Sequence, residues 1–163
     1  MIREASLNDL DTCYQIETSA YAGDEAATRE KIEKRILTYP EGFLVLELDD
    51  EVVALVNAGA TDKVEMSDEA FKELIGHDPA GRHIVIMSVA VAPAHQGKGY
   101  AGRLLSAFID RMRTMDKREI HLICQTELID FYAKYGFEYR CVSDSEHGGL
   151  NWHEMTLNLS TGG

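Results

Sequence analysis

The sequence predicts one α/β domain in which helices flank a mixed β-sheet. Apolar runs typical of strands alternate with segments whose apolar residues recur every three or four positions, in the order β, α, α, β, β, (α), β, α, β, α, β, β. The 163 residues suffice for one hydrophobic core, and we find no repeat or linker within residues 1–163. Hydrophobic residues at 45% and charged residues at 27% are usual for a globular protein.

The first forty residues predict a short strand and two helices. Residues 2–4 can form the strand, and Ser6 can cap the following helix with Asp9 in the capping-box position. A second helix is expected from about residue 26 to residue 37, and Pro40 ends it because proline has no backbone N–H.

The middle of the chain predicts a hairpin and a buried strand. In residues 43–60, two apolar strands flank a turn at Asp49 and Asp50. Residues 61–82 form a polar insertion with a short helix that Ser67 starts. Residues 84–91 are almost continuously apolar, which is typical of a strand at the buried centre of a sheet.

The last third predicts two helices and three strands. Apolar side chains mark one face of a long helix, namely Leu104, Leu105, Phe108, Ile109 and Met112. Residues 119–124 read as a strand, and residues 127–135 read as a helix closed by Gly136. Residues 137–142 and 150–159 read as two strands that pair with each other.

Charge and apolar content exclude several classes of partner. The formal net charge of −12 argues against a nucleic-acid partner, because phosphates would be repelled. It is compatible with a cationic substrate, but an acidic surface is more often simply a solvated surface. The first ten residues contain no long apolar stretch, and the longest apolar run, residues 84–94, is too short to span a bilayer. We therefore expect a cytoplasmic protein without a signal peptide or a membrane partner.

The three cysteines predict no disulfide framework. Cys13, Cys124 and Cys141 are an odd number without paired spacing, which is typical of thiols in a reducing compartment. No CxxC motif or His/Cys cluster is present along the chain, so the sequence predicts no metal site.

A glycine-rich turn between a strand and a helix is the strongest local signal. In "VAVAPAHQGKGYAGRLL", residues 89–105, glycines let the backbone approach a ligand at a helix N-terminus, where unpaired N–H groups favour phosphate. A Walker loop is excluded because Lys98 precedes Gly99 instead of Ser or Thr. Gly97, Gly99 and Gly102 match the dinucleotide pattern GxGxxG, but they follow the fourth strand, and the next strand lacks a well-placed ribose carboxylate.

Two blocks resemble the GNAT superfamily of acyl-CoA-dependent N-acyltransferases. Residues 96–101 are similar to its Q/R-x-x-G-x-G/A pyrophosphate loop, within a longer V-x-P-x-x-Q-G-x-G block. "ELIDFYAKYGFEY", residues 127–139, is similar to its F-Y-x-x-x-G-F block. Their separation and element order also match, so the resemblance covers most of the chain.

The resemblance implies a mixed, mainly antiparallel sheet, splayed between its fourth and fifth strands to admit CoA. It assigns the CoA pyrophosphate to a loop and helix start, namely Gln96, Gly97, Lys98, Gly99, Tyr100, Ala101 and Gly102. It assigns the pantetheine arm to the strand at Val89, Ala90 and Val91. Gln125 stands where many members have asparagine, and its longer amide could still bond to CoA. His95, beside the loop, is expected at the surface.

The implied reaction is N-acetylation by acetyl-CoA as co-substrate, without a metal. In the family, the tyrosine that matches Tyr132 donates a proton to the leaving thiolate. A backbone N–H near residues 87–89 can polarise the thioester carbonyl. The base is open: Ser88 could hold a water, with Glu17 or Glu25 as the final proton acceptor.

The substrate side resembles the arylalkylamine N-acetyltransferase branch. Residues 19–28 are similar to its substrate-contacting turn, which implies substrate contacts for Tyr21, Asp24 and Glu25. Vertebrate members carry two histidines on the central strand, whereas here the nearest is His83, just before it. Tyr14, Tyr21 and Trp152 could line a pocket for an aromatic amine or belong to the core. Asp24 and Glu25 could attract the second ammonium of a polyamine or simply be solvated.

The sequence therefore favours an N-acetyltransferase acting on a small primary amine. A peptide or protein N-acetyltransferase and a non-catalytic CoA-binding regulatory module stay open as alternatives. Edge strands of such sheets often pair between copies, so a homodimer is also an open expectation.

Overall fold

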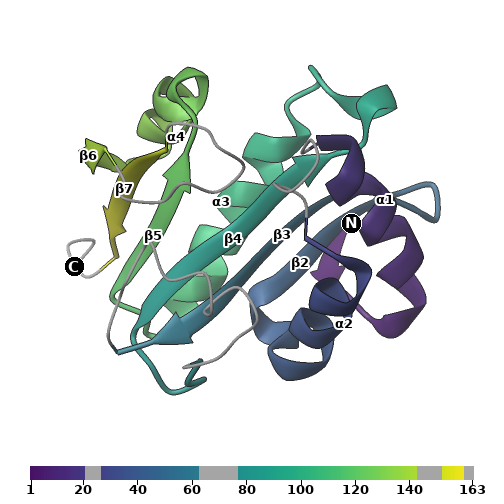
Figure 1. The fold of residues 1–163 in the computed structure, drawn as a ribbon, viewed down its shortest axis with the longest axis horizontal. Coiled ribbons are helices and arrows are strands. Elements are labelled where there is room, and N and C mark those ends of the chain that lie inside the picture. Colours follow the sequence, from purple (N-terminus) through teal and green to yellow (C-terminus); the bar gives the residue numbers. More distant parts are fainter. Residues whose placement is uncertain (21–26, 63–76, 143–151, 160–163) are drawn as a thin grey trace.

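One mixed sheet organises the molecule (Figure 1). The computed structural model describes residues 1–20, 27–62, 77–142 and 152–159. Within these ranges seven strands lie in the order β1-β2-β3-β4-β5-β7-β6. Their bounds are β1 Ile2–Glu4, β2 Phe43–Leu48, β3 Glu51–Thr61, β4 His83–Val91, β5 Glu119–Cys124, β6 Glu138–Val142 and β7 His153–Asn158. Among the described strands only β4 and β5 pair in parallel, so the predicted mixed, mainly antiparallel α/β fold is confirmed.

The sheet is splayed between β4 and β5. Their ladder covers only His83–Val85 on β4 and Glu119–His121 on β5. Beyond these positions the two strands diverge, as Figure 1 shows. The splay that the sequence resemblance implies is therefore present.

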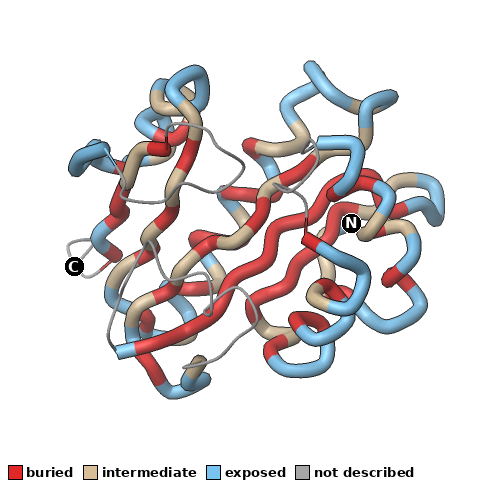
Figure 2. Tube along the Cα trace, viewed as in Figure 1, coloured by how far each residue is buried: buried red, intermediate tan, exposed pale blue. Residues whose placement is uncertain are grey.

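Helices cover both faces of the sheet. Helix α3, Tyr100–Thr114, and helix α4, Ile129–Lys134, share one apolar cluster with the sheet. Helix α1, Leu10–Ala20, and helix α2, Arg29–Thr38, share a second cluster on the opposite face. Strands β2 and β3 lie between these layers and are almost entirely buried (Figure 2). Within the described ranges, no helix has the length and apolarity needed to cross a membrane.

Local sequence signals set most element boundaries. The Ser6 amide donates to the Asp9 carboxylate at 2.8 Å, which confirms the capping box ahead of α1. Asp49 and Asp50 both have positive φ angles, 49° and 65°, as a tight hairpin turn requires. Gly136, at φ 99°, ends α4 as predicted.

Three expectations need correction or lie outside the described residues. The second helix begins at Arg29, not near residue 26, because Thr28 caps it by accepting a hydrogen bond from the Lys31 amide at 3.2 Å. Strand β4 alternates between buried and half-buried residues along its whole length instead of being buried throughout, so one of its two faces is only partly covered. The short helix predicted at Ser67 lies outside the described residues.

The three cysteines are present as thiols, as the sequence predicts. Cys13 and Cys124 are buried and Cys141 is exposed, and none of the three forms a disulfide in the part of the chain that the structure describes. Burial raises the pKa of the Cys13 thiol to about 12 and that of the Cys124 thiol to about 11. The two buried thiols therefore stay protonated near neutral pH.

Candidate active site

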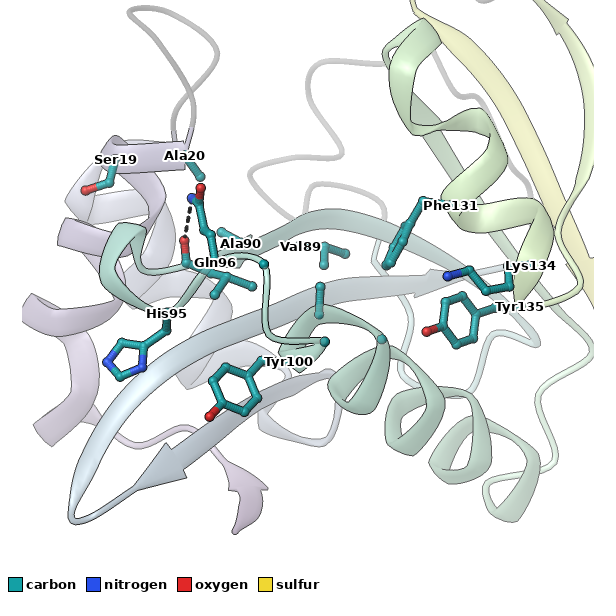
Figure 3. A pocket seen from close by; sticks show the side chains of 15 residues that line it. Ser19, Ala20, Val89, Ala90, His95, Gln96, Tyr100, Phe131, Lys134 and Tyr135 are labelled. Carbon is teal, nitrogen blue, oxygen red and sulfur yellow. Dashed lines mark hydrogen bonds between the residues drawn. The ribbon is translucent and has the colours of Figure 1, made fainter.

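The glycine turn after β4 adopts a backbone that side chains disfavour. Gly97 and Gly99 have φ angles of 77° and 84°, in the left-handed region. A side-chain carbon at either position would meet no atom within 4 Å, so conformation and not space is the reason for glycine here. The Gln96 side chain donates from Nε2 to the Val91 carbonyl oxygen at 3.1 Å, which ties the turn back to β4 (Figure 3).

Helix α3 starts at this turn without a capping side chain. Gly99 is its N-cap residue, and the first intrahelical hydrogen bond of this end runs from the Arg103 amide to the Gly99 carbonyl at 3.1 Å. The amides of Tyr100, Ala101 and Gly102 consequently have no intrahelical acceptor. These donors and the positive end of the helix dipole make the turn suited to an anion such as a pyrophosphate.

A cleft of about 590 Å³ opens above the turn (Figure 3). This volume lies within the range of small-molecule sites, about 300–1,000 Å³. The cleft brings together most of the residues to which the resemblance assigned CoA, namely Val89, Ala90, Val91, Gln96, Gly97, Gly99, Tyr100, Ala101 and Gly102. Its wall therefore runs from the diverging half of β4 to the first turn of α3.

Four predicted residues do not line this cleft. Lys98 is exposed, and Gln125 lies half-buried at the end of β5. Ser88 and Tyr132 are buried, with exposed fractions of 3% and 6%. The Tyr132 ring packs edge-on against Phe137, with ring centroids 5.7 Å apart.

Sequence reasoning missed four cleft residues, namely His95, Phe131, Lys134 and Tyr135, whereas the cleft residues Ser19 and Ala20 begin the predicted substrate-contacting turn. Phe131 and Tyr135 are four residues apart, a spacing that places them on one face of the helix predicted over residues 127–135 and could have indicated them. Lys134 lies with Nζ 5.9 Å from the Tyr135 ring centroid, so a cation borders the cleft. His95, expected at the surface, is half-buried, and its Nδ1 makes no hydrogen bond within the described residues.

A group of buried polar side chains lies on the α1–α2 side of the sheet. Glu17 is 2% exposed and accepts a hydrogen bond from the Ala27 amide at 2.9 Å. Arg35 donates from Nη1 to the Asn57 side-chain oxygen at 3.1 Å, and Asn57 faces Ser88 across the β3–β4 ladder. Glu17 Oε1 and Asn57 Nδ2 are buried without a hydrogen-bond partner in the part of the chain that the structure describes.

The predicted substrate residues Tyr21, Asp24 and Glu25 lie outside the described residues. Ser19 and Ala20, at the end of α1, border the cleft directly before them. The aromatic candidates differ in burial, since Trp152 is 6% exposed and Tyr14 is half-buried.

Three side chains that could hold a metal ion meet at the other end of β4. Within the described residues, they are His83, Glu119 and His121. The linear spacing of histidines and cysteines did not reveal this group, because its members lie on two strands paired in parallel. Burial lowers the pKa of the His121 imidazole, which favours its neutral form at pH 7.

Comparison with known proteins indicates the same family as the sequence resemblance. Residues 7–137 match the family described as "Acetyltransferase (GNAT) family". The loading GNATL domain of CurA from Lyngbya majuscula has a similar structure (TM-score 0.85, 16% identity, 99% of this chain and 98% of that chain). Ard1 from Thermoplasma volcanium is also similar (TM-score 0.77, 21% identity, 97% of this chain and 96% of that chain). So is yncA from Salmonella typhimurium, a putative acetyltransferase solved with acetyl-CoA (TM-score 0.68, 24% identity, 98% of this chain and 93% of that chain). At these sequence identities, the structural similarity shows a shared fold and nothing more. Among curated proteins, none matches this chain in sequence.

Proposed function

The chain belongs to the acetyltransferase (GNAT) family, and from this premise we propose that it moves an acetyl group from acetyl-CoA to a small primary amine by direct attack of the amine. The observation that carries the proposal is the uncapped start of α3 behind two left-handed glycines, at the edge of a cleft beside the diverging half of β4. This arrangement suits a ligand with a pyrophosphate at one end and a slender arm at the other.

The residues present fit acetyl-CoA, which supplies an activated acetyl thioester when bound. The amides at Gly97–Gly102 would hold the pyrophosphate, and Val89 and Val91 would lie along the pantetheine arm. Lys134 lines the cleft and would supply a positive charge to the phosphates. Lys98 does not line the cleft and is therefore less suited to this role.

The backbone of β4 offers a site for carbonyl polarisation. Asn57 pairs with Ser88 and Ala58 pairs with Ile86, so Met87 is an extra residue without a partner position on β3. Such a bulge turns backbone groups out of the ladder. We infer that an N–H of residues 87–89 donates to the thioester oxygen, as in other acyl-transfer sites.

The chain must also remove a proton from the amine. A free alkylamine has a pKa of about 10.4, so nearly all of it is protonated at neutral pH. Glu17 is the described carboxylate best suited to accept the proton, because it is buried and one of its oxygens has no hydrogen bond within the described residues. Ser88, buried on the same side of the sheet, would hold a connecting water.

Tyr132 remains the proposed acid. It stands at the tyrosine of the F-Y-x-x-x-G-F block, on the helix that forms one wall of the cleft. Its phenol would donate a proton to the departing thiolate, and its burial between Phe131 and Phe137 would fix the ring.

The acceptor would enter beside the end of α1. Ser19 and Ala20 line the cleft there, and Tyr21, Asp24 and Glu25 follow directly. A net charge of −12 would attract a cationic amine. Both features support a small amine, with an aromatic or polyamine character left to experiment.

The test is CoA-thiol release from acetyl-CoA with arylalkylamines, polyamines and short peptides in parallel. We expect turnover with small amines at a kcat/KM at least about tenfold above that with peptides. Preference for peptides would overturn the substrate class and favour a peptide or protein N-acetyltransferase. Thermal stabilisation by CoA without any amine-dependent thiol release would favour the CoA-binding module.

A further inference from the structure

The closed end of the splay holds three side chains suited to a metal ion. His83 opens β4, and Glu119 and His121 lie two residues apart on β5. In the parallel ladder His83 pairs with Glu119, and Val85 pairs with His121. Because side chains alternate along a strand, the three project from the same face of the sheet. This group lies about 20 Å along β4 from Val89, so it is separate from the CoA cleft.

The distances between the candidate ligand atoms match a small coordination shell. His83 Nδ1 lies 3.1 Å from Glu119 Oε1 and 3.2 Å from His121 Nε2. His121 Nε2 lies 4.0 Å from Glu119 Oε1. In tetrahedral zinc sites, bonds of about 2.0–2.1 Å place neighbouring ligand atoms about 3.4 Å apart. A small rotation of Glu119, whose side chain is 29% exposed, would bring the longest distance into that range.

Hydrogen bonding alone satisfies this group poorly. His83 Nδ1 lies within hydrogen-bond distance of both Glu119 Oε1 and His121 Nε2, and when neutral it carries at most one hydrogen to share between them. Thr156 Oγ1 lies 3.3 Å from His121 Nδ1, so an Nδ1–H that donates to this hydroxyl leaves the Nε2 lone pair facing the group. An outer hydrogen bond of this kind orients metal-ligating histidines in proteins. With the His83 proton on Nε2, both imidazole lone pairs become available to a metal ion, and the two nitrogens and the carboxylate oxygen lie within 4.0 Å of one another.

We propose that His83, Glu119 and His121 bind a divalent first-row transition-metal ion, with Zn²⁺ as the representative. Two imidazoles and one carboxylate suit such ions, whereas Ca²⁺ and Mg²⁺ prefer oxygen ligands in larger number. All three side chains are partly exposed, so the ion can enter from solvent. Bound there, the ion links β4 to β5 at the positions where their ladder pairs them. It thereby holds together the end of the splay at which the two strands are still paired.

The experiment measures Zn²⁺ binding to the full chain, purified without a histidine tag and treated with a chelator. Calorimetry is expected to show one ion per chain with a Kd on the order of 1 μM or tighter. The melting temperature is expected to rise by about 5 °C or more at a hundredfold excess of free Zn²⁺ over Kd. His121→Ala and Glu119→Gln are each expected to weaken binding at least about tenfold.

The matched control is His153→Ala. His153 lies on neighbouring β7 and also contacts a threonine hydroxyl, with Nε2 2.8 Å from Thr126 Oγ1, but it is not part of the group. This variant is expected to keep wild-type affinity. The proposal is overturned if Zn²⁺ does not bind the wild type saturably, or if His153→Ala loses affinity as the group variants do. It is also overturned if Glu119→Gln, the change least disruptive to folding, binds as the wild type does.

Discussion

Gly102 and Tyr135 pack so closely that a methyl group on Gly102 would overlap the Tyr135 hydroxyl. Gly102 lies in the first turn of α3, and Tyr135 follows α4, so the contact joins two walls of the cleft. The three glycines of the G-x-G-x-x-G pattern thus have two distinct roles. Gly97 and Gly99 permit a left-handed backbone, whereas Gly102 permits a close approach.

Gly102→Ala is expected to displace the Tyr135 ring and change the cleft more than the stability. The nearest atom is the end of a side chain, so the ring can move, and the free energy of unfolding should fall by about 1–3 kcal/mol. The KM for acetyl-CoA should rise at least about fivefold, because the cleft loses its wall. Adding Tyr135→Phe should recover part of both effects in a double-mutant cycle. Additive effects would show that the two residues do not interact.

Gly99→Ala and Lys98→Ala separate backbone geometry from charge in the turn. Alanine at φ 84° costs about 1–2 kcal/mol, so we expect the Kd for acetyl-CoA to rise about tenfold as the turn relaxes. Lys98 is exposed and does not line the cleft. Because solvent and salt screen an exposed charge, its substitution should change the Kd for acetyl-CoA less than threefold. Calorimetric titration of both variants decides the point. A larger effect at Lys98 would mean that charge, and not backbone amides, holds the phosphates.

Tyr132→Phe tests the proposed acid. Loss of the phenol should lower kcat at least about tenfold while the Kd for acetyl-CoA stays within about twofold. The matched control is Tyr139→Phe, because Tyr139 also carries a hydroxyl but is exposed on β6, where it contacts His153 Nδ1 at 3.0 Å. Unchanged kcat in Tyr132→Phe would assign this tyrosine to the core alone.

The sequence predicted what depends on neighbouring residues. The Ser6–Asp9 capping box, the Asp49–Asp50 turn and the left-handed glycines are local features that residue type largely decides. The start of α2 was placed too early because the Thr28 cap was not recognised.

What the sequence could not supply was contact between distant segments. Lys134 and Tyr135 reach the cleft only because the end of α4 lies against the first turn of α3. His83 meets His121 only through the parallel β4–β5 register. Family resemblance located the blocks that form the cleft, but not which side chains of α4 face it.

Asp9→Asn should weaken the protein near neutral pH and matter much less in acid. Asp9 accepts two hydrogen bonds from Arg3, at 2.8 and 3.0 Å, and this interaction with Arg3 lowers the pKa of the Asp9 carboxyl in spite of burial. A carboxyl with a lowered folded-state pKa contributes stability above its unfolded pKa of about 3.9, and loses it as pH falls through the folded value. We expect the variant to lose about 1–2 kcal/mol of unfolding free energy at about pH 7.

Urea unfolding of wild type and Asp9→Asn at about pH 7, 5 and 3 measures this dependence. The difference between the two proteins should be constant from about pH 7 to 5 and should shrink below about pH 4. Asp11→Asn is the matched control, since Asp11 pairs with Arg29 at 3.0 Å but its side chain is 78% exposed. An exposed pair of this kind should contribute less than about 1 kcal/mol. A difference for Asp9→Asn that stays the same at all three pH values would show that the side chain acts through shape and capping, and not through its charge beside Arg3.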